Sequence, residues 1–253
     1  MAWSKDSLSR LSTVDSTNRY VRDEAATLWA KSGFADGLVV VSAEHQTAGR
    51  GQRGNTWNSN AGENLLFSIL IRPNETLRVA NQFLLSQAVA LALHDAMKSY
   101  GIDTRLKWPN DIYVGKRKLA GVLVELDYSG AFVEQAIIGV GINVNQVLFP
   151  VMDRIPVSMK MLQGRSFVTD KILETVIDCF ERNYTELCKG NTYAITAQYT
   201  GLLLGINERR SYIDADGPFE GVIEEVENDG HLLVRRADGA MSRYAFKEIE
   251  QPL

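Results

Sequence analysis

The sequence predicts an α+β protein in which a larger domain precedes a small all-β unit. Two apolar runs, "GLVVVSAE" at 37–44 and "ENLLFSILIR" at 63–72, are typical of buried strands. Apolar residues at helical spacing predict a long core helix over about 77–100. After Gly205, Asp-Gly turns recur at the spacing typical of small all-β units, so we place a domain boundary there.

The N-terminal segment predicts a short strand followed by a helix that begins at "DSTN", residues 15–18. Asp15, Ser16 and Thr17 are suitable helix caps, so capping alone would explain this sequence. Downstream, a polar loop of roughly 19 residues separates the two apolar strands. A loop of this length inside a compact domain is unusual unless it is functional or disordered.

The middle of the chain, "RLKWPNDIYVGKRKLAGVLVELDYSGAFVEQAIIGVGINV", predicts three strands joined by short turns. The turn signals at Gly115 and Gly130 separate β-rich runs, so the sheet is at least partly antiparallel. A helix is expected over about 168–189, and a second helical stretch runs to about residue 200.

Composition is that of an ordinary globular protein, with 45% hydrophobic and 23% charged residues. The net charge of −4 argues against nucleic acid as a partner, because nucleic-acid binders usually carry a basic surplus. No run approaches the roughly 18 apolar residues of a membrane helix, and the N-terminus lacks a signal-peptide core. Cys179 and Cys188 lie about 13 Å apart along one helix, too far for a disulfide. These features indicate a cytoplasmic protein with free thiols.

The stretch "GRGQRGNTW", from Gly49 to Trp57, contains three glycines and two arginines, and this pattern predicts an anion-binding loop. Glycines let backbone N–H groups approach an anion closely, and Arg50 and Arg53 add charge-assisted bonds. The phosphate-loop signature would end in Gly-Lys-Ser/Thr, which is absent. The alternative is a solvated surface loop.

A second candidate segment is "KWPNDIYVGKRKLAG". Lys107 and Trp108 precede a proline, and Asn110 and Asp111 open a strand. Lys118 is followed by a run too apolar for a surface strand, so its amine is expected near the buried face, where it needs an anionic partner. A basic hairpin in water explains Lys118 equally well.

A third candidate is "IIGVGINVN". Its two glycines allow close approach of a ligand, and Asn143 could hydrogen-bond a base edge. As a dinucleotide fingerprint it fails, because no third glycine and no helix pattern follow. The three histidines are scattered without zinc-site spacing, and no Gly-x-Ser-x-Gly elbow occurs.

Taken in order, "DSTN", "AEHQTAGRGQRGNTW", "KWPNDIYVGKRKLAGVLVEL" and "GVGINVN" resemble the motifs of the biotin protein ligases. The resemblance implies a mixed β-sheet flanked by helices, a biotin- and ATP-binding catalytic domain over 1–205, and a small β-barrel over 206–253. It implies a two-step reaction: biotin and ATP, with Mg²⁺, give biotinyl-5′-AMP, and a lysine of a biotin carboxyl carrier protein then takes the biotin.

The resemblance also implies roles for individual residues. Those expected to act catalytically are Lys118, Arg50 and Lys107. Those expected to bind biotin are Ser16, Thr17, Asn18, Gln46, Arg50, Gly51 and Lys118. Those expected to contact the nucleotide are Arg53, Trp57, Lys107, Asn110 and Asn143, with Trp57 and Trp108 as walls of the site. No metal ligands are identified.

The sequence differs from some relatives in two places, and each difference leads to an expectation. Some relatives have arginine where this loop has Gln52, so the Gln52→Arg variant should release the adenylate more slowly. Some bacterial relatives carry an N-terminal DNA-binding domain, but "DSTN" begins here at residue 15, so we expect a ligase without a repressor role. Lipoate–protein ligase and a non-catalytic biotin sensor remain alternatives, and exposed strand edges would allow a homodimer.

Overall fold

The computed structural model describes residues 8–32, 37–151 and 154–252. The strands are β1 (Leu8–Val14), β2 (Leu38–Gln46), β3 (Leu65–Ile71), β4 (Arg105–Lys107), β5 (Asp111–Val114), β6 (Arg117–Ser129), β7 (Phe132–Ile142), β8 (Arg209–Asp214), β9 (Gly217–Val226), β10 (Leu232–Arg236) and β11 (Met241–Tyr244). The helices are α1 (Thr17–Asp23), α2 (Ala25–Ser32), α3 (Phe83–Ser99), α4 (Met159–Gln163), α5 (Thr169–Cys188) and α6 (Thr192–Gly201).

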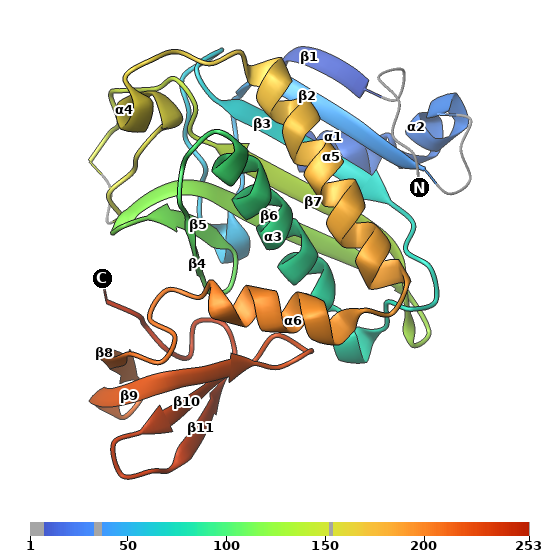
Figure 1. Cartoon of the computed structure of the whole chain (residues 1–253). Coiled ribbons are helices and arrows are strands. Elements are labelled where there is room, and N and C mark those ends of the chain that lie inside the picture. Colours follow the sequence, from blue (N-terminus) through green and yellow to red (C-terminus); the bar gives the residue numbers. More distant parts are fainter. Residues whose placement is uncertain (1–7, 33–36, 152–153, 253) are drawn as a thin grey trace.

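The large sheet has seven strands in the order β1-β2-β3-β7-β6-β5-β4 (Figure 1). Strands β1 and β2 pair parallel, and every other described pair in this sheet is antiparallel. The expectation of a mixed sheet flanked by helices is therefore confirmed. The three strands expected between residues 105 and 144 are β5, β6 and β7, with the short β4 added at the edge.

Different helices pack on the two faces of this sheet. Alternate residues of β2 belong to different apolar clusters: Leu38 and Val40 pack in the main core, Val39 and Val41 in a smaller one. The main core includes the apolar side of α3 and α5, which lie across the front of the sheet in Figure 1. Residues of α1 and α2 complete the smaller cluster. The second face is thus covered only near the β1–β2–β3 edge, which leaves the rest of it for a site.

Element boundaries differ from the sequence expectation in two places. The single N-terminal helix is two helices, α1 and α2, which meet at Glu24. The long helix α3 begins at Phe83 rather than near residue 77, because a short 3₁₀ turn at Val79–Asn81 precedes it. Both cysteines lie on α5 and are free, as expected.

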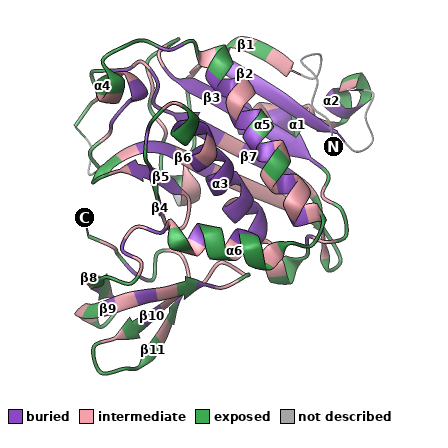
Figure 2. Ribbon diagram, in the orientation of Figure 1, coloured by how far each residue is buried: buried purple, intermediate pink, exposed green. Residues whose placement is uncertain are grey.

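The C-terminal strands form a separate four-stranded antiparallel sheet in the order β11-β10-β9-β8. Its outer strands β8 and β11 do not pair with each other in the described part of the chain, so the small barrel expected here is an open sheet. Figure 2 shows many more exposed residues on these strands than on β2, β3 and β7. Apolar residues of this sheet nevertheless join the main core, and a domain boundary at Gly205 stays a prediction. None of the described helices is long and apolar enough to cross a membrane.

Candidate active site

A cavity of about 450 Å³ lies on the sheet face that α3 and α5 leave uncovered. On β7, Gly139 and Gly141 line the cavity, whereas Ile138 and Ile142 point into the main core. The volume suits a small organic molecule or a nucleotide. Asn18 approaches Gly139, whereas Trp57 and Lys118 approach Gly121, the ladder partner of Gly141. Hydroxyl and amide side chains and charged ones therefore line different stretches of the cavity.

The hydroxyl and amide side chains are positioned where α1 follows β1, and the Arg50–Glu125 ion pair borders them. Gln46, at the end of β2, accepts hydrogen bonds from the backbone N–H of Thr17 at 2.7 Å and from its hydroxyl at 3.0 Å. Ser68 Oγ on β3 lies 2.6 Å from Asn18 Oδ1 and 2.7 Å from Thr17 Oγ1. Asn18 donates to Glu125 Oε2 at 2.9 Å. These bonds hold a row of polar side chains in fixed rotamers at the cavity wall.

The side chain of Ser16 tests whether helix capping alone explains "DSTN". It occupies the N-cap position of α1, but its side chain makes no capping hydrogen bond. The residue is 3% exposed and lines the cavity. Capping therefore explains the backbone conformation at Ser16 but not its hydroxyl, which is available to a ligand.

The glycine loop folds back on itself at the cavity mouth. Gly51 N–H donates to Asn55 O at 2.7 Å, and Trp57 N–H donates to Gly49 O at 2.9 Å. These N–H groups are therefore engaged within the loop and do not form a ready anion nest. The charge of Arg50 is also engaged, because its Nη2 lies 3.3 Å from Glu125 Oε1.

The glycines of β6 and β7 make room for protein side chains. A Cβ on Gly141 would lie 2.4 Å from Trp57 Cε2, and one on Gly139 would lie 2.3 Å from Asn18 Oδ1. We expected a ligand to approach these glycines closely. Instead, the side chains of Trp57 and Asn18 make this close approach. The indole N–H of Trp57 is buried and has no hydrogen-bond partner among the described residues.

The charged end centres on Asp111, which is 6% exposed. Its Oδ1 lies 2.6 Å from Lys118 Nζ, and its Oδ2 lies 2.7 Å from Arg154 Nη1. The Lys118 amine also lies 5.4 Å from the centroid of the Trp57 ring. The expectation of an anionic partner for Lys118 is therefore met by Asp111, and the solvated-hairpin alternative is wrong.

A β-bulge brings Lys118 to the cavity. Opposite Ile112 and Tyr113 of β5, the partners on β6 are Ala120 and Lys118, so Leu119 is an extra residue. Leu119 and Ala120 both belong to the main core on the other face. The extra residue reverses the alternation, as bulges do, and directs Lys118 to the face that carries Asp111 and Gly121.

Lys107 lies beside this cluster rather than in the wall of the cavity. It is the cross-strand neighbour of Asp111 in the β4–β5 ladder. Burial, and then the positive charges of Arg154 and Lys118, outweigh Asp111 and lower the pKa of Lys107 to about 8. The cluster thus carries more positive charge than its one carboxylate offsets.

The two expected nucleotide-binding asparagines also have structural partners. Asn110 donates its amide to Val122 O. Asn143, 4% exposed, donates to Lys118 O at 3.3 Å and Val157 O at 3.2 Å. Both line the cavity. Their amide donors fix the backbone around Lys118.

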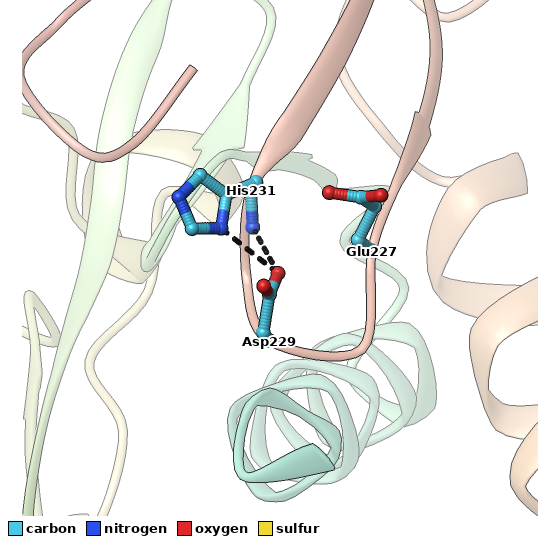
Figure 3. Close-up of side chains that lie close together, drawn as sticks. All are labelled: Glu227, Asp229 and His231. Atoms are coloured by element: carbon cyan, nitrogen blue, oxygen red, sulfur yellow. Dashed lines mark hydrogen bonds and ion pairs between the residues drawn. The ribbon is translucent and has the colours of Figure 1, made fainter. Parts of the chain in front are cut away.

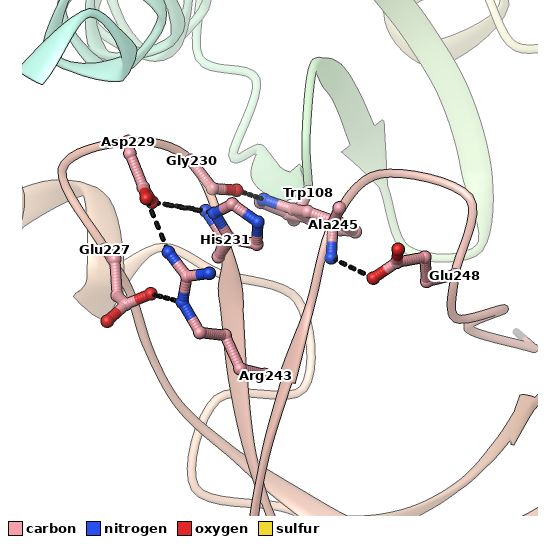
Figure 4. A network of polar contacts seen from close by, with 8 residues as sticks. All are labelled: Trp108, Glu227, Asp229, Gly230, His231, Arg243, Ala245 and Glu248. Carbon is pink, nitrogen blue, oxygen red and sulfur yellow. Dashed lines mark hydrogen bonds and ion pairs between the residues drawn. The ribbon is translucent and has the colours of Figure 1, made fainter. Parts of the chain in front are cut away.

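Two other expected residues remain, Arg53 and Trp108. The side chain of Arg53 lies outside the described residues. Trp108 is not among the residues that line the cavity. Its indole donates to Gly230 O at 3.0 Å (Figure 4), and its ring meets Phe246 edge to face. Phe246, from the C-terminal part of the chain, does line the cavity. Trp108 therefore joins the two sheets next to the site.

Four polar residues of the site had no role in the sequence analysis: Ser68, Asp111, Glu125 and Arg154. Glu125 stands in the apolar run "LAGVLVEL", and a lone carboxylate in such a strand was a usable signal. Asp111 follows Asn110 at the start of β5, where its position was noted without a role. Arg154 lies in an irregular segment after β7, and no local pattern marks it.

A group of potential metal ligands lies away from the cavity. Glu227, Asp229 and His231 come within 4.8 Å of one another at the β9–β10 turn (Figure 3). Arg243 forms ion pairs with both carboxylates, and His231 Nδ1 lies 2.9 Å from Asp229 (Figure 4). Because these carboxylates are already paired, we assign the group to the stability of the turn.

Residues 11–143, 133 of the 253 residues, match the Biotin/lipoate A/B protein ligase family. The chain therefore belongs to this family. It is 31% identical over 245 residues to the biotin--[acetyl-CoA-carboxylase] ligase of Paracoccus denitrificans, covering 90% of this chain and 94% of that one. The resemblance to biotin protein ligases is confirmed, and this protein is a ligase.

A second relative and a solved structure agree. The bifunctional ligase/repressor BirA of Bacillus subtilis is 30% identical over 219 residues, 85% of this chain and 67% of its own length. The biotin protein ligase from Aquifex aeolicus in complex with biotin and ATP has the same fold, with a TM-score of 0.78 and 24% identity. The match covers 96% of this chain and 97% of the Aquifex chain.

Proposed function

We propose that this ligase condenses biotin with ATP to biotinyl-5′-AMP and transfers the biotin to a lysine of a biotin carboxyl carrier protein. The observation that carries the proposal is one cavity with two chemically different ends. Hydroxyl and amide groups at one end suit the donors and acceptors of a ureido ring, and cations at the other suit a carboxylate and phosphates. Biotin has a ureido ring and a carboxylate at its opposite ends.

Biotin is placed with its ring between Ser16, Thr17 and Gln46 and its carboxylate toward Lys118. The hydroxyl and amide groups near Gly139 and the cation near Gly121 support this direction. Asn18, held by Ser68 and Glu125, forms the side wall. Because these groups are already oriented by hydrogen bonds, the ring binds without ordering them further.

In the first step, a biotin carboxylate oxygen attacks the α-phosphorus of ATP, and pyrophosphate leaves. Lys118 offers its ammonium group to the carboxylate and then to the charge that develops on the α-phosphoryl oxygens. Arg50 exchanges Glu125 for the same anion when the glycine loop closes. Such transfers are accelerated mainly by positioning and by fixed cations.

In the second step, the ε-amine of the acceptor lysine attacks the carbonyl carbon of the mixed anhydride, and AMP leaves with the bonding electrons. Closure of the loop from Gly49 to Trp57 keeps water from this anhydride. Asn110, Asn143 and Trp57 border the nucleotide, and Arg53 is proposed as a further phosphate contact.

Mg²⁺ is proposed to enter with ATP rather than to occupy a protein site. Both oxygens of Asp111 are engaged by Lys118 and Arg154, and Glu125 is engaged by Arg50 and Asn18. The described cavity wall therefore offers no unpaired carboxylate to hold a resident ion. A homodimer, the absence of nucleic-acid binding and a cytoplasmic location stay predictions.

The test is pyrophosphate release from Mg-ATP with biotin, with lipoate and with neither, before any acceptor is added. We expect a burst stoichiometric with the protein, with biotin only. Release with lipoate alone would keep the chemistry and replace the substrate, which the family allows. Biotin binding without release in any mixture would contradict the proposal and favour a sensor.

A further inference from the structure

The charged end of the cavity contains more positive charge than its surroundings neutralise. Asp111 is shared between Lys118 at 2.6 Å and Arg154 at 2.7 Å, and Lys107 is its neighbour in the β4–β5 ladder. Three cations thus surround one carboxylate, and two positive charges are left over. Poor screening makes this surplus costly, because Asp111 is 6% and the Lys118 side chain 19% exposed.

Two neighbouring groups respond to this environment. The pKa of Lys107 falls to about 8 because burial and then the charges of Arg154 and Lys118 outweigh the attraction of Asp111. The hydroxyl of Tyr113 is buried without a hydrogen-bond partner in the described ranges, and burial raises its pKa to about 12, so it remains a donor. An anion at this part of the cavity would offset the surplus positive charge that contributes to the lowered pKa of Lys107.

Arg154 is the member of the cluster best placed to move. Its side chain is 48% exposed, far more than that of Lys118 or Asp111. The backbone that follows it is held in place, because Lys118 N–H donates to Ile155 O at 2.8 Å and Val157 N–H donates to Lys118 O at 2.9 Å. The guanidinium can therefore leave Asp111 without displacing the segment that carries it.

We propose that Arg154 binds the β- and γ-phosphates of ATP and so stabilises pyrophosphate as it leaves, an inference that rests on the proposed adenylation. When a biotin oxygen bonds to the α-phosphorus, the bond from that phosphorus to the α,β-bridging oxygen breaks. The bridging oxygen keeps the electron pair and becomes part of pyrophosphate. The planar guanidinium, transferred from Asp111, meets this charge with two parallel N–H donors. Asp111 meanwhile continues to hold Lys118.

The experiment measures binding of inorganic pyrophosphate and of biotin by calorimetry, together with the KM for ATP in biotin-dependent pyrophosphate release. The variants are Arg154→Ala and Arg154→Lys, and Arg117→Ala is the matched control, because Arg117 is an exposed arginine outside the cavity wall. Loss of a charge-assisted hydrogen bond predicts about tenfold weaker pyrophosphate binding and a similar rise in KM for Arg154→Ala. Arg154→Lys should lie between, and biotin affinity should not change.

The outcomes separate the possible roles of Arg154. Pyrophosphate binding that is equal in wild type and Arg154→Ala, or absent from the wild type, would overturn the assignment. An equal loss of biotin and pyrophosphate affinity would also overturn it and show that Arg154 only anchors Asp111. Pyrophosphate binding needs no turnover, so a wild type that binds it but releases none with biotin would contradict the proposed function instead.

Discussion

Asp111 illustrates how a single buried carboxylate sets the geometry of a charged cluster. Burying a lysine amine without a partner is costly, because the ammonium group gives up its hydration. Pairing with Asp111 at 2.6 Å keeps the Lys118 amine at a fixed point beside the Trp57 ring. The proposed chemistry needs this positive charge before either substrate arrives.

Lys118→Ala should abolish the first step while leaving the fold intact. The variant removes the cation that faces the carboxylate and α-phosphate, and loss of such a group costs roughly 100-fold or more in kcat. Biotin-dependent pyrophosphate release checks the result, and Lys116→Ala, on the exposed turn of the same hairpin, is the matched control. Equal rates in the two variants would remove Lys118 from the mechanism.

We expect Lys107 to make ATP binding depend on pH above about 8, the value to which its pKa is lowered. In the free protein Lys107 loses its proton above this pH, whereas bound phosphates favour the protonated form. ATP binding then takes up a proton, so affinity should fall as pH rises from about 8 toward 10. The KM for ATP measured across this range checks the prediction.

The Lys107→Arg variant is the control for this pH effect, because arginine stays charged throughout the range. Its KM should vary less with pH than that of the wild type. For folding of the free protein the sign is opposite. The unfolded chain holds the Lys107 proton up to its ordinary pKa of 10.5, so this residue makes the protein more stable as pH rises above about 8. A thermal melt series without ligand tests that sign.

At the scale of elements, periodicity predicted the strands and helices but not the side on which key residues emerge. Strict alternation along β6 would place Lys118 with Ala120 on the core face. The bulge at Leu119 reverses this, and nothing in "KRKLAGVL" marks a bulge, because its position depends on pairing with β5.

The residues of the cavity illustrate the same limit. The family motifs named most of the lining, including Gln46, Arg50 and Lys118, because those residues lie in contiguous, specific blocks. Arg154 could not be found in this way. Its partner Asp111 is 43 positions away in the chain, and an arginine in an irregular segment is ordinarily solvated. Only the folded arrangement brings the two together.

Gly141→Ala tests whether the floor of β6 and β7 positions the indole of Trp57. The added Cβ would lie 2.4 Å from Trp57 Cε2, so the ring must shift from its position beside Lys118. We expect about tenfold weaker ATP binding. This is within the range for loss of a partly buried cation–π contact such as that of Lys118 with Trp57. Gly201→Ala is the matched control, because no atom lies within 4 Å of its added Cβ. Unchanged ATP affinity in Gly141→Ala would show that Trp57 does not contact the nucleotide.

At the scale of the whole molecule, the two sheets share one core and one cavity. The Asp-Gly turns that recur after Gly205 correctly indicated a second β unit. They could not indicate how closely that unit packs against the large sheet. Trp108 donates to Gly230 O, Phe83 N–H donates to Asn228 O at 3.2 Å, and Phe246 lines the cavity. We therefore expect changes at the joint between the two sheets to reach the cavity through Phe246.

Trp108→Phe tests this coupling between the sheets. The substitution keeps an aromatic ring in the core, removes the hydrogen bond to Gly230 and leaves that carbonyl without its donor (Figure 4). We expect the free energy of unfolding to fall by about 1–2 kcal/mol. Because Trp108 also supports Phe246, the KM for ATP should rise while biotin affinity at the far end of the cavity stays constant.

Trp29→Phe is the matched control for Trp108→Phe. It loses an equivalent indole hydrogen bond, to Gln135 Oε1 at 3.2 Å, on α2 and away from the C-terminal sheet. A similar loss of stability with no change in either substrate constant is expected for this control. If both variants lose stability but neither alters the KM for ATP, the C-terminal sheet stabilises the fold without shaping the ATP site. Equal changes in biotin and ATP constants for Trp108→Phe would instead indicate that the joint supports the whole large sheet.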